Sequence, residues 1–151
     1  AGHDEAPGLA AMRQAETTAG MDGPDWYRGF QRQAESVKDE FLAFLLEQKR
    51  VGCSVAGYGA AAKGNTLLNF AGIRSDLVAF VADASPHKQG RFLPGSRIPV
   101  VAEDRLRQEK PDFVVIFPWN LREEITSQLA YIREWGGRFV FAVPRLEVVP
   151  A

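Results

Sequence analysis

The sequence predicts an α/β fold with a mostly parallel sheet of about five strands, helices on both faces and a long amphipathic helix in front. Two observations predict it. Short apolar runs alternate along residues 51–143 with segments in which apolar side chains recur every three or four positions. In addition, a glycine-rich segment follows the first apolar run and opens a helix, as in the first turn of doubly wound, Rossmann-like domains.

The leading helix is expected over residues 25–49. Residues 22–25 read Asp-Gly-Pro-Asp, and a proline with acidic residues nearby is typical of a helix start. Apolar side chains then fall on one helical face: Trp26, Phe30, Ala34, Val37, Phe41, Phe44 and Leu45. Residues 1–22 are Ala-rich and weakly patterned, with a short helix expected at 9–19. We therefore predict an N-terminal tail or linker over 1–22 and a single domain over 23–151.

The remaining elements are predicted from changes in the spacing of apolar residues along the sequence. Buried strands are predicted at 51–56, 77–82, 98–101, 113–117 and 138–143. Helices are predicted at 60–70 and 102–109, and a third is expected to start at Asn120 with a capping box and to end at Gly136. A Pro- and Gly-rich basic loop fills 84–97. Right-handed crossovers then give a Rossmann-like, doubly wound sheet.

Composition excludes several classes of function. The 18 basic and 19 acidic residues nearly balance, which argues against binding long nucleic acid by bulk charge. No apolar run reaches the roughly 20 residues of a membrane span, and no signal peptide is apparent. Cys53 is the lone cysteine and is placed inside a buried strand, where it is expected to be inert; it indicates a reducing compartment, the cytoplasm. With His3 and His87 as its histidines, the chain is not expected to hold a metal.

Ligands of such sheets bind beyond the carboxyl ends of the strands. This places four segments in one crevice: 57–65, 83–91, 118–120 and 144–145.

The first segment carries a partial dinucleotide fingerprint, in which Gly57, Gly59 and Ala62 occupy the three small-residue positions. Small residues let a phosphate approach the amides of residues 57–60 (Gly57, Tyr58, Gly59, Ala60) at a helix start, and Lys63 adds a positive charge. The alternative is a tight turn that needs glycine for steric reasons alone. Tyr58 either lines the pocket or packs beneath the loop.

Two other phosphate or cofactor loops are excluded. Asn65 follows Gly64 where a Walker loop needs Lys and then Ser or Thr. Val55 and Ala56 stand where a loop for S-adenosylmethionine usually has an acidic residue, so this segment is not expected to bind that cofactor.

The second segment starts at Asp83, 26 positions after Gly57. An acidic residue at a strand end binds ribose hydroxyls in dinucleotide folds, although it equally often caps the next turn. His87, Lys88 and Arg91 then supply up to three positive charges for a diphosphate, or they form a solvated basic loop.

The third segment offers Trp119 for stacking on a base or sugar and Asn120 for hydrogen bonding, although a capping box explains Asn120 without a ligand. No Ser-His-Asp, Cys-His or paired-carboxylate constellation is apparent, so no catalytic residue is assigned. The residues favour a binding cleft over a reaction centre.

Four linked motifs resemble the C-terminal domain of the S-adenosylmethionine-dependent sugar C-methyltransferases. They are GYGAAAKGNTLLN at 57–69, PHKQGRFLPG at 86–95, PWN at 118–120 and REWGGRF at 133–139. The resemblance covers about residues 25–145, in order and at similar spacing.

The resemblance implies a division of labour. Full-length members of this family have a zinc-binding N-terminal domain, a middle domain that binds S-adenosylmethionine and holds the catalytic His and Glu, and the domain that this chain is similar to. The substrate, a nucleotide-linked deoxysugar such as a dTDP-sugar, lies between the last two. By resemblance, Lys63, Asn65, His87 and Lys88 face this substrate, S-adenosylmethionine is bound by the middle domain, and this chain alone does not transfer methyl groups.

Two alternatives stay open. Rossmann domains that bind NAD or coenzyme A share the glycine loop, the strand-end Asp and a Lys-Gln-Gly segment, which would make Asp83 a ribose ligand. A non-catalytic interaction module would instead use the helix at 25–49, with Trp26, Tyr27 and Phe30, as a docking face.

Overall fold

The structure, a computed structural model, describes residues 7–149. The chain divides into two compact units between Ser36 and Val37, a boundary that falls inside the helix α2, Phe30–Arg50.

The first unit contains α1 (Pro7–Thr18), a 3₁₀ turn η1 (Pro24–Tyr27) and the start of α2. The short helix predicted at 9–19 is thus present, and residues 1–6 of the predicted tail lie outside the described residues. The predicted start of the long helix at residue 25 is wrong. Pro24 opens a separate 3₁₀ turn, and Gly29, whose backbone is costly to order in a helix, separates that turn from α2.

The second unit is built on a six-stranded sheet with the strand order β3-β2-β1-β4-β5-β6. Its strands are β1 (Val55–Tyr58), β2 (Val81–Ala82), β3 (Val100–Val101), β4 (Phe113–Ile116), β5 (Arg138–Phe141) and β6 (Glu147–Val149). The first five are parallel to their neighbours, which confirms the predicted sheet, whereas β6 was not predicted and pairs antiparallel with β5.

The first strand begins later than predicted. Helix α2 continues to Arg50 and is closed by Gly52, whose φ of +80° suits glycine. Cys53 therefore precedes the strand and is half-buried against the core, so its predicted place inside a buried strand is wrong. As a consequence β1 extends through Gly57 and Tyr58, and the glycine loop starts at its last residues.

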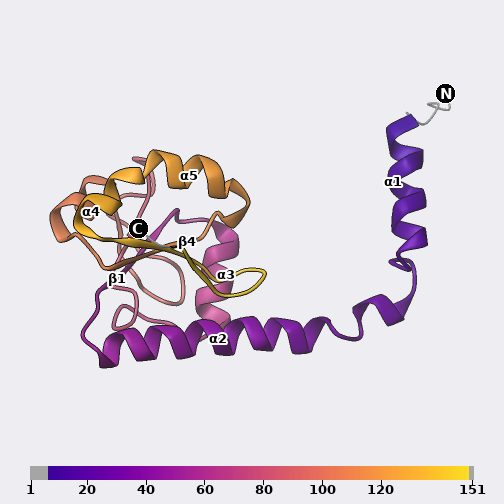
Figure 1. Cartoon of the computed structure of the whole chain (residues 1–151), viewed down its shortest axis with the longest axis horizontal. Helices are drawn as coiled ribbons and strands as arrows, with labels where there is room; N and C mark the ends of the chain where they lie inside the picture. Colours follow the sequence, from indigo (N-terminus) through magenta and orange to yellow (C-terminus); the bar gives the residue numbers. More distant parts are fainter. Residues whose placement is uncertain (1–6, 150–151) are drawn as a thin grey trace. The chain divides into compact units, whose positions relative to one another are not determined.

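Helices cover both faces of the sheet, as a doubly wound fold requires (Figure 1). On one face, the part of α2 from Val37 onward and α3 (Ala62–Phe70) bury Phe41, Leu45 and Leu68 against the strands. Burying one such side chain contributes about 1.5–3 kcal/mol. The other face is covered by α4 (Asp104–Glu109), α5 (Arg122–Gln128) and η3 (Ala130–Trp135).

The helix predicted to start at Asn120 is divided into three pieces. A 3₁₀ turn, η2 (Trp119–Leu121), follows β4, and α5 starts only after it. The N-cap of α5 is Leu121, which makes no side-chain cap bond, so the predicted capping role of Asn120 is wrong. Gly136, at φ +80°, ends η3 as predicted.

Candidate functional site

Three of the four predicted segments meet beyond the carboxyl ends of β1, β2 and β4. The amide of Ala60 donates to Asp83 Oδ2 at 2.7 Å, and Lys63 Nζ donates to Asn120 Oδ1. Among the described residues, none of the hydrogen bonds that join these segments involves residues 144–145. The site is thus formed by the glycine loop, the loop at 83–91 and the turn η2.

Close packing against the end of β4 explains the glycines of the loop. A Cβ on Gly57 would lie 2.5 Å from Phe117 Cε2, and one on Gly64 would lie 2.5 Å from Phe117 Cβ. A Cβ on Gly59, which has a φ of +82°, would overlap the ring of Pro118. The steric interpretation of these glycines therefore holds whether or not a phosphate binds.

The amides of the loop are largely used inside the protein. The amide of Gly57 donates to Phe80 O at 2.8 Å, that of Gly59 to Ala82 O at 2.8 Å, and that of Ala60 to Asp83. Among the described residues, no acceptor is found for the amides of residues 62–64 (Ala62, Lys63, Gly64), the first turn of α3, whose N-cap Ala61 makes no side-chain bond.

The available amides thus lie a few positions further along than the sequence predicts. Sequence reasoning missed Ala62 and Gly64 as amide donors because it placed the helix start at residue 60. A helix start placed at residue 62 would have found them.

Lys63 extends across the site to η2. Its ammonium donates to Asn120 Oδ1 and lies 4.6 Å from the ring centroid of Trp119. Within residues 7–149, no carboxylate forms an ion pair with Lys63. Its positive charge is therefore held by neutral groups and is not compensated.

Asp83 links the glycine loop to the basic loop. Its side chain is nearly buried and accepts from the amides of Ala60 (2.7 Å) and Ser85 (2.8 Å) and from Lys88 Nζ (3.0 Å). Burial by itself raises the pKa of Asp83, but the hydrogen bonds from Ser85, Lys88 and Ala60 outweigh it and hold the pKa below its usual value. This arrangement matches the strand-end interpretation of Asp83, and its contact with a ligand stays a prediction.

The three basic residues of the second loop differ. The charge of Lys88 is paired with Asp83, whereas His87 and Arg91 are exposed and form no ion pair with any described residue. The backbone of Arg91 pairs with Val100, so this end of the loop is fixed along β3.

Tyr58 points to the face of the sheet that α4 and α5 cover. Its hydroxyl donates to Glu103 Oε2 at 3.1 Å and accepts from Gln128 Nε2 at 2.8 Å, and the hydroxyl of Tyr131 donates to Glu103 Oε1 at 3.1 Å. Burial and the neighbouring Glu103 raise the pKa of Tyr58 to about 12. Of the two interpretations, packing beneath the loop is the one that the structure shows.

Asn65 has one unsatisfied atom. Its Oδ1 is buried without a hydrogen-bond partner among the described residues, although its backbone carbonyl accepts from Asn69 Nδ2 at 2.9 Å. A buried acceptor without a partner is costly to the fold.

Comparison with known proteins identifies the family. The model of the C-methyltransferase C-terminal domain matches residues 1–144. The chain belongs to this family. It is 33% identical over 151 residues to the C-methyltransferase NovU of Streptomyces niveus. The match covers the whole chain but 36% of NovU, so the chain spans about a third of this relative's length.

Membership confirms the resemblance seen in the four motifs. The family match begins at residue 1 and thus includes the segment predicted as a tail or linker.

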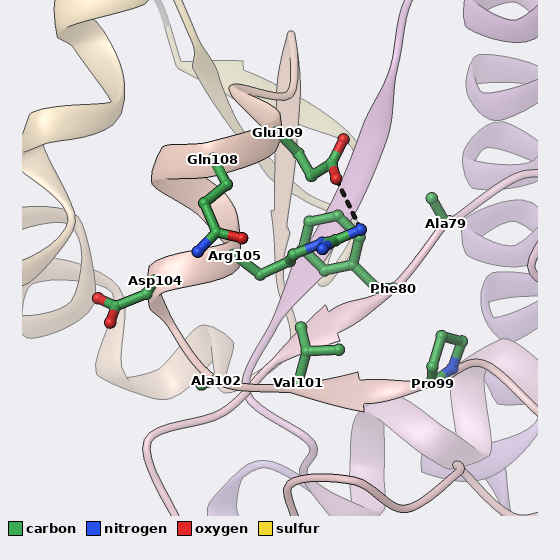
Figure 2. Close-up of a pocket in the computed structure, with 9 residues that line it drawn as sticks. All are labelled: Ala79, Phe80, Pro99, Val101, Ala102, Asp104, Arg105, Gln108 and Glu109. Atoms are coloured by element: carbon green, nitrogen blue, oxygen red, sulfur yellow. Dashed lines mark ion pairs between the residues drawn. The ribbon is translucent and has the colours of Figure 1, made fainter.

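A hollow of this C-methyltransferase domain lies away from the glycine loop. It measures about 630 Å³ and is bounded by α4, by the edge strand β3 and by the residues that lead into β2 (Figure 2). Arg105 and Glu109 of α4 form an ion pair of 2.7 Å beside Phe80, as Figure 2 shows. None of the predicted site residues lines this hollow.

Two further observations concern metals and membranes. Across residues 7–149, no group of three or more His, Cys, Asp and Glu side chains is arranged to hold a metal ion. In the same part of the chain, none of the helices combines the length and apolar composition needed to cross a bilayer.

Proposed function

We propose that this domain binds the nucleotide-linked sugar substrate of an S-adenosylmethionine-dependent C-methyltransferase. Its family and its similarity to NovU support a role in C-methylation. The chain spans about a third of NovU, which supports a further proposal: the catalytic residues belong to another part of the same enzyme, and this domain alone transfers no methyl group.

The observation that carries the substrate proposal is the first turn of α3. Within the part of the chain that the structure describes, the amides of residues 62–64 have no acceptor, and the Lys63 ammonium on the same turn has no carboxylate partner. A helix N-terminus with free amides attracts negative charge, and a lysine adds a positive point charge. A diphosphate is the part of a nucleotide-linked sugar that needs such a site.

The surrounding residues would complete the pocket. His87 and Arg91 are exposed on the loop that Asp83 ties to Ala60, so they are available to the phosphates or the sugar. Trp119 is half-buried beside Lys63 and offers a ring for stacking on a base or sugar.

We infer that S-adenosylmethionine is not the ligand of this loop. The acidic group that could hold its ribose, Asp83, already accepts hydrogen bonds from Ala60, Ser85 and Lys88. We therefore infer that the cofactor, which supplies an electrophilic methyl group when bound, lies on the S-adenosylmethionine-binding domain of the same protein. The residues of this chain would bind and orient the substrate. The same contacts of Asp83 argue against NAD as the ligand. The single free Cys53 supports a cytoplasmic location.

Thermal-shift and calorimetric titrations test this proposal. We expect dTDP and dTDP- or UDP-sugars to raise the unfolding midpoint, because a ligand that binds the native state stabilises it, and S-adenosylmethionine to leave it unchanged. Lys63→Ala should weaken dTDP binding about tenfold, as expected for a lost charge-assisted hydrogen bond, without unfolding the domain. Lys49→Ala is the matched control, since Lys49, on α2, forms an exposed ion pair with Asp76.

Other outcomes would contradict the proposal. Binding of NAD or coenzyme A alone would favour a dinucleotide-type domain. No binding of any of these ligands would favour an interaction module, for which Trp26, Tyr27 and Phe30 of the first unit, exposed by 51%, 55% and 68%, offer an apolar surface.

A further inference from the structure

The ammonium of Lys63 is fixed in place by two residues of the turn η2, which we call the lysine cradle: Trp119 and Asn120. Asn120 Oδ1 accepts a hydrogen bond from Lys63 Nζ, and the Trp119 ring centroid lies 4.6 Å from the same atom. A free lysine side chain samples many rotamers, and the cradle restricts this freedom before any ligand arrives.

The cradle is tied to the glycine loop. Pro118, which precedes the two cradle residues, packs so closely on Gly59 that a Cβ on Gly59 would overlap the proline ring. The hydrogen bond from the amide of Leu121 to Pro118 O, at 2.8 Å, closes the turn that carries both cradle residues. The position of the Lys63 ammonium is therefore set relative to the first turn of α3.

The cradle is also electrically neutral. A carboxylate partner would hold a lysine equally well but would cancel its charge, as Asp83 does for Lys88 at 3.0 Å. A carboxamide oxygen and an aromatic face attract the ammonium while leaving its net charge available. Asn120 is free for this role because it caps no helix.

We propose that Asn120 is a positioning residue that, together with Trp119, holds the Lys63 ammonium ready for the diphosphate of the substrate. This inference rests on the proposed function and deepens it: Asn120 acts on the ligand through Lys63. A structural role in the turn η2 would weaken binding whether or not Lys63 is present, so the two roles are separable.

The first test requires no ligand. The methylene protons next to Lys63 Nζ lie near the Trp119 ring, so their proton NMR signals should be shifted upfield by the ring current. We expect this shift in the wild-type chain, its loss in Trp119→Leu and its reduction in Asn120→Ala, with the signal assigned by its absence from Lys63→Ala. An unshifted Lys63 signal in the wild-type chain would overturn the proposal.

The second test is a double-mutant cycle with dTDP as the probe. Asn120→Ala should raise the dissociation constant about threefold when Lys63 is present, the loss expected for one neutral hydrogen bond, and should have no effect in the Lys63→Ala background. Gln108→Ala, an exposed change in the hollow beside α4, is the control and should leave binding unchanged. An equal effect of Asn120→Ala in both backgrounds would overturn the proposal.

Asn120→Asp tests separately whether residue 120 holds the Lys63 ammonium and whether the site must keep its positive charge. The aspartate should keep the upfield shift of Lys63 but weaken dTDP binding at least as much as alanine does, because its carboxylate cancels the ammonium. Tighter binding than in Asn120→Ala would contradict the neutral cradle. Absence of dTDP binding by the wild-type chain would overturn the proposed function and this inference together, whereas binding with an additive cycle would overturn the inference alone.

Discussion

A glycine at one position can serve packing, ligand binding or both, and Gly64 illustrates the difference. The fingerprint at the helix start does not require glycine there, yet a Cβ on Gly64 would lie 2.5 Å from Phe117 Cβ and 2.7 Å from Phe117 Cγ. These atoms lie close to the backbone of the strand end and move little. Helix propensity alone would favour alanine by about 1 kcal/mol, but the clash acts in the opposite direction.

We expect Gly64→Ala to lower the free energy of unfolding by about 1–3 kcal/mol, the usual cost of overpacking a well-packed site. Urea denaturation measures the change. Gly29→Ala is the control, because a Cβ at Gly29 meets nothing within 4 Å and its φ is not positive. A Gly64→Ala variant as stable as wild type would show that Phe117 gives way.

At the same scale, the sequence predicted the residue types of the site better than their pairing. Lys63, Asp83, Trp119 and Asn120 were all singled out, and three of the four segments that carry site residues do meet. The capping role of Asn120 was wrong because a local signal, a polar residue three positions before an acidic one, competed with a contact 57 positions away. Long-range contacts of this kind leave no periodic trace in one sequence.

Among the elements, a polar network around Glu103 joins β1 to the helices above it. Glu103 accepts from Tyr58 (3.1 Å), Gln128 (2.8 Å) and Tyr131 (3.1 Å), and the Arg107 guanidinium lies 3.4 Å from the Tyr131 ring centroid. The network fixes the strand that leads into the glycine loop.

Replacing Glu103 tests this link. Glu103→Gln removes the charge while keeping an acceptor, so the pKa of Tyr58 should fall below about 12 and stay above its ordinary value, because burial is the larger cause of its shift. Ultraviolet titration of the tyrosines measures the pKa. Glu103→Ala should in addition cost about 1–3 kcal/mol of stability, since the buried Tyr58 hydroxyl loses its acceptor. A Tyr58 pKa unchanged in Glu103→Gln would contradict the network.

Element boundaries were harder to predict than element types. All five parallel strands lie where apolar runs were found, but β2 and β3 each have only two residues. The residues just before β2 still bond to β1, through the Ala79 amide to Val55 O and the Gly57 amide to Phe80 O. The strand β6 escaped prediction because it is three residues long and lies antiparallel at the sheet edge, where no crossover signals it.

At the scale of the whole molecule, the doubly wound order places the site where the chain's direction of winding changes. β1 lies between β2 and β4, and the strand order reverses at β1. The connections to the two sides of β1 therefore cross opposite faces of the sheet, which leaves a crevice beside the loop after β1. This position follows from the alternation of strands and helices and was predictable. The identity of the sugar and base was not, because it depends on the shape of side chains such as Trp119 and on groups outside this chain.

The molecule as a whole should lose stability in acid. The pKa values of Asp83 and Asp112 are held below their usual range in the folded chain, Asp112 through hydrogen bonds from the Ser54 amide (2.7 Å) and hydroxyl (2.8 Å). A carboxyl whose folded pKa is lowered stabilises the fold at pH values above its unfolded pKa of about 3.9. That contribution is lost as the pH falls through the lower folded pKa.

Urea denaturation at a series of pH values between neutrality and about pH 2 tests this expectation. The free energy of unfolding should fall most steeply below about pH 4, and Asp83→Asn and Asp112→Asn should each flatten part of that fall. Asp104→Asn, which removes an exposed carboxylate at the start of α4, is the matched control for the loss of one acidic group. Asp83→Asn should also free Lys88 and loosen the tie between Ala60 and the basic loop, so its neutral-pH stability should lie below that of the control. A pH dependence equal in all four proteins would mean that the carboxylates of Asp83 and Asp112 do not couple protonation to folding.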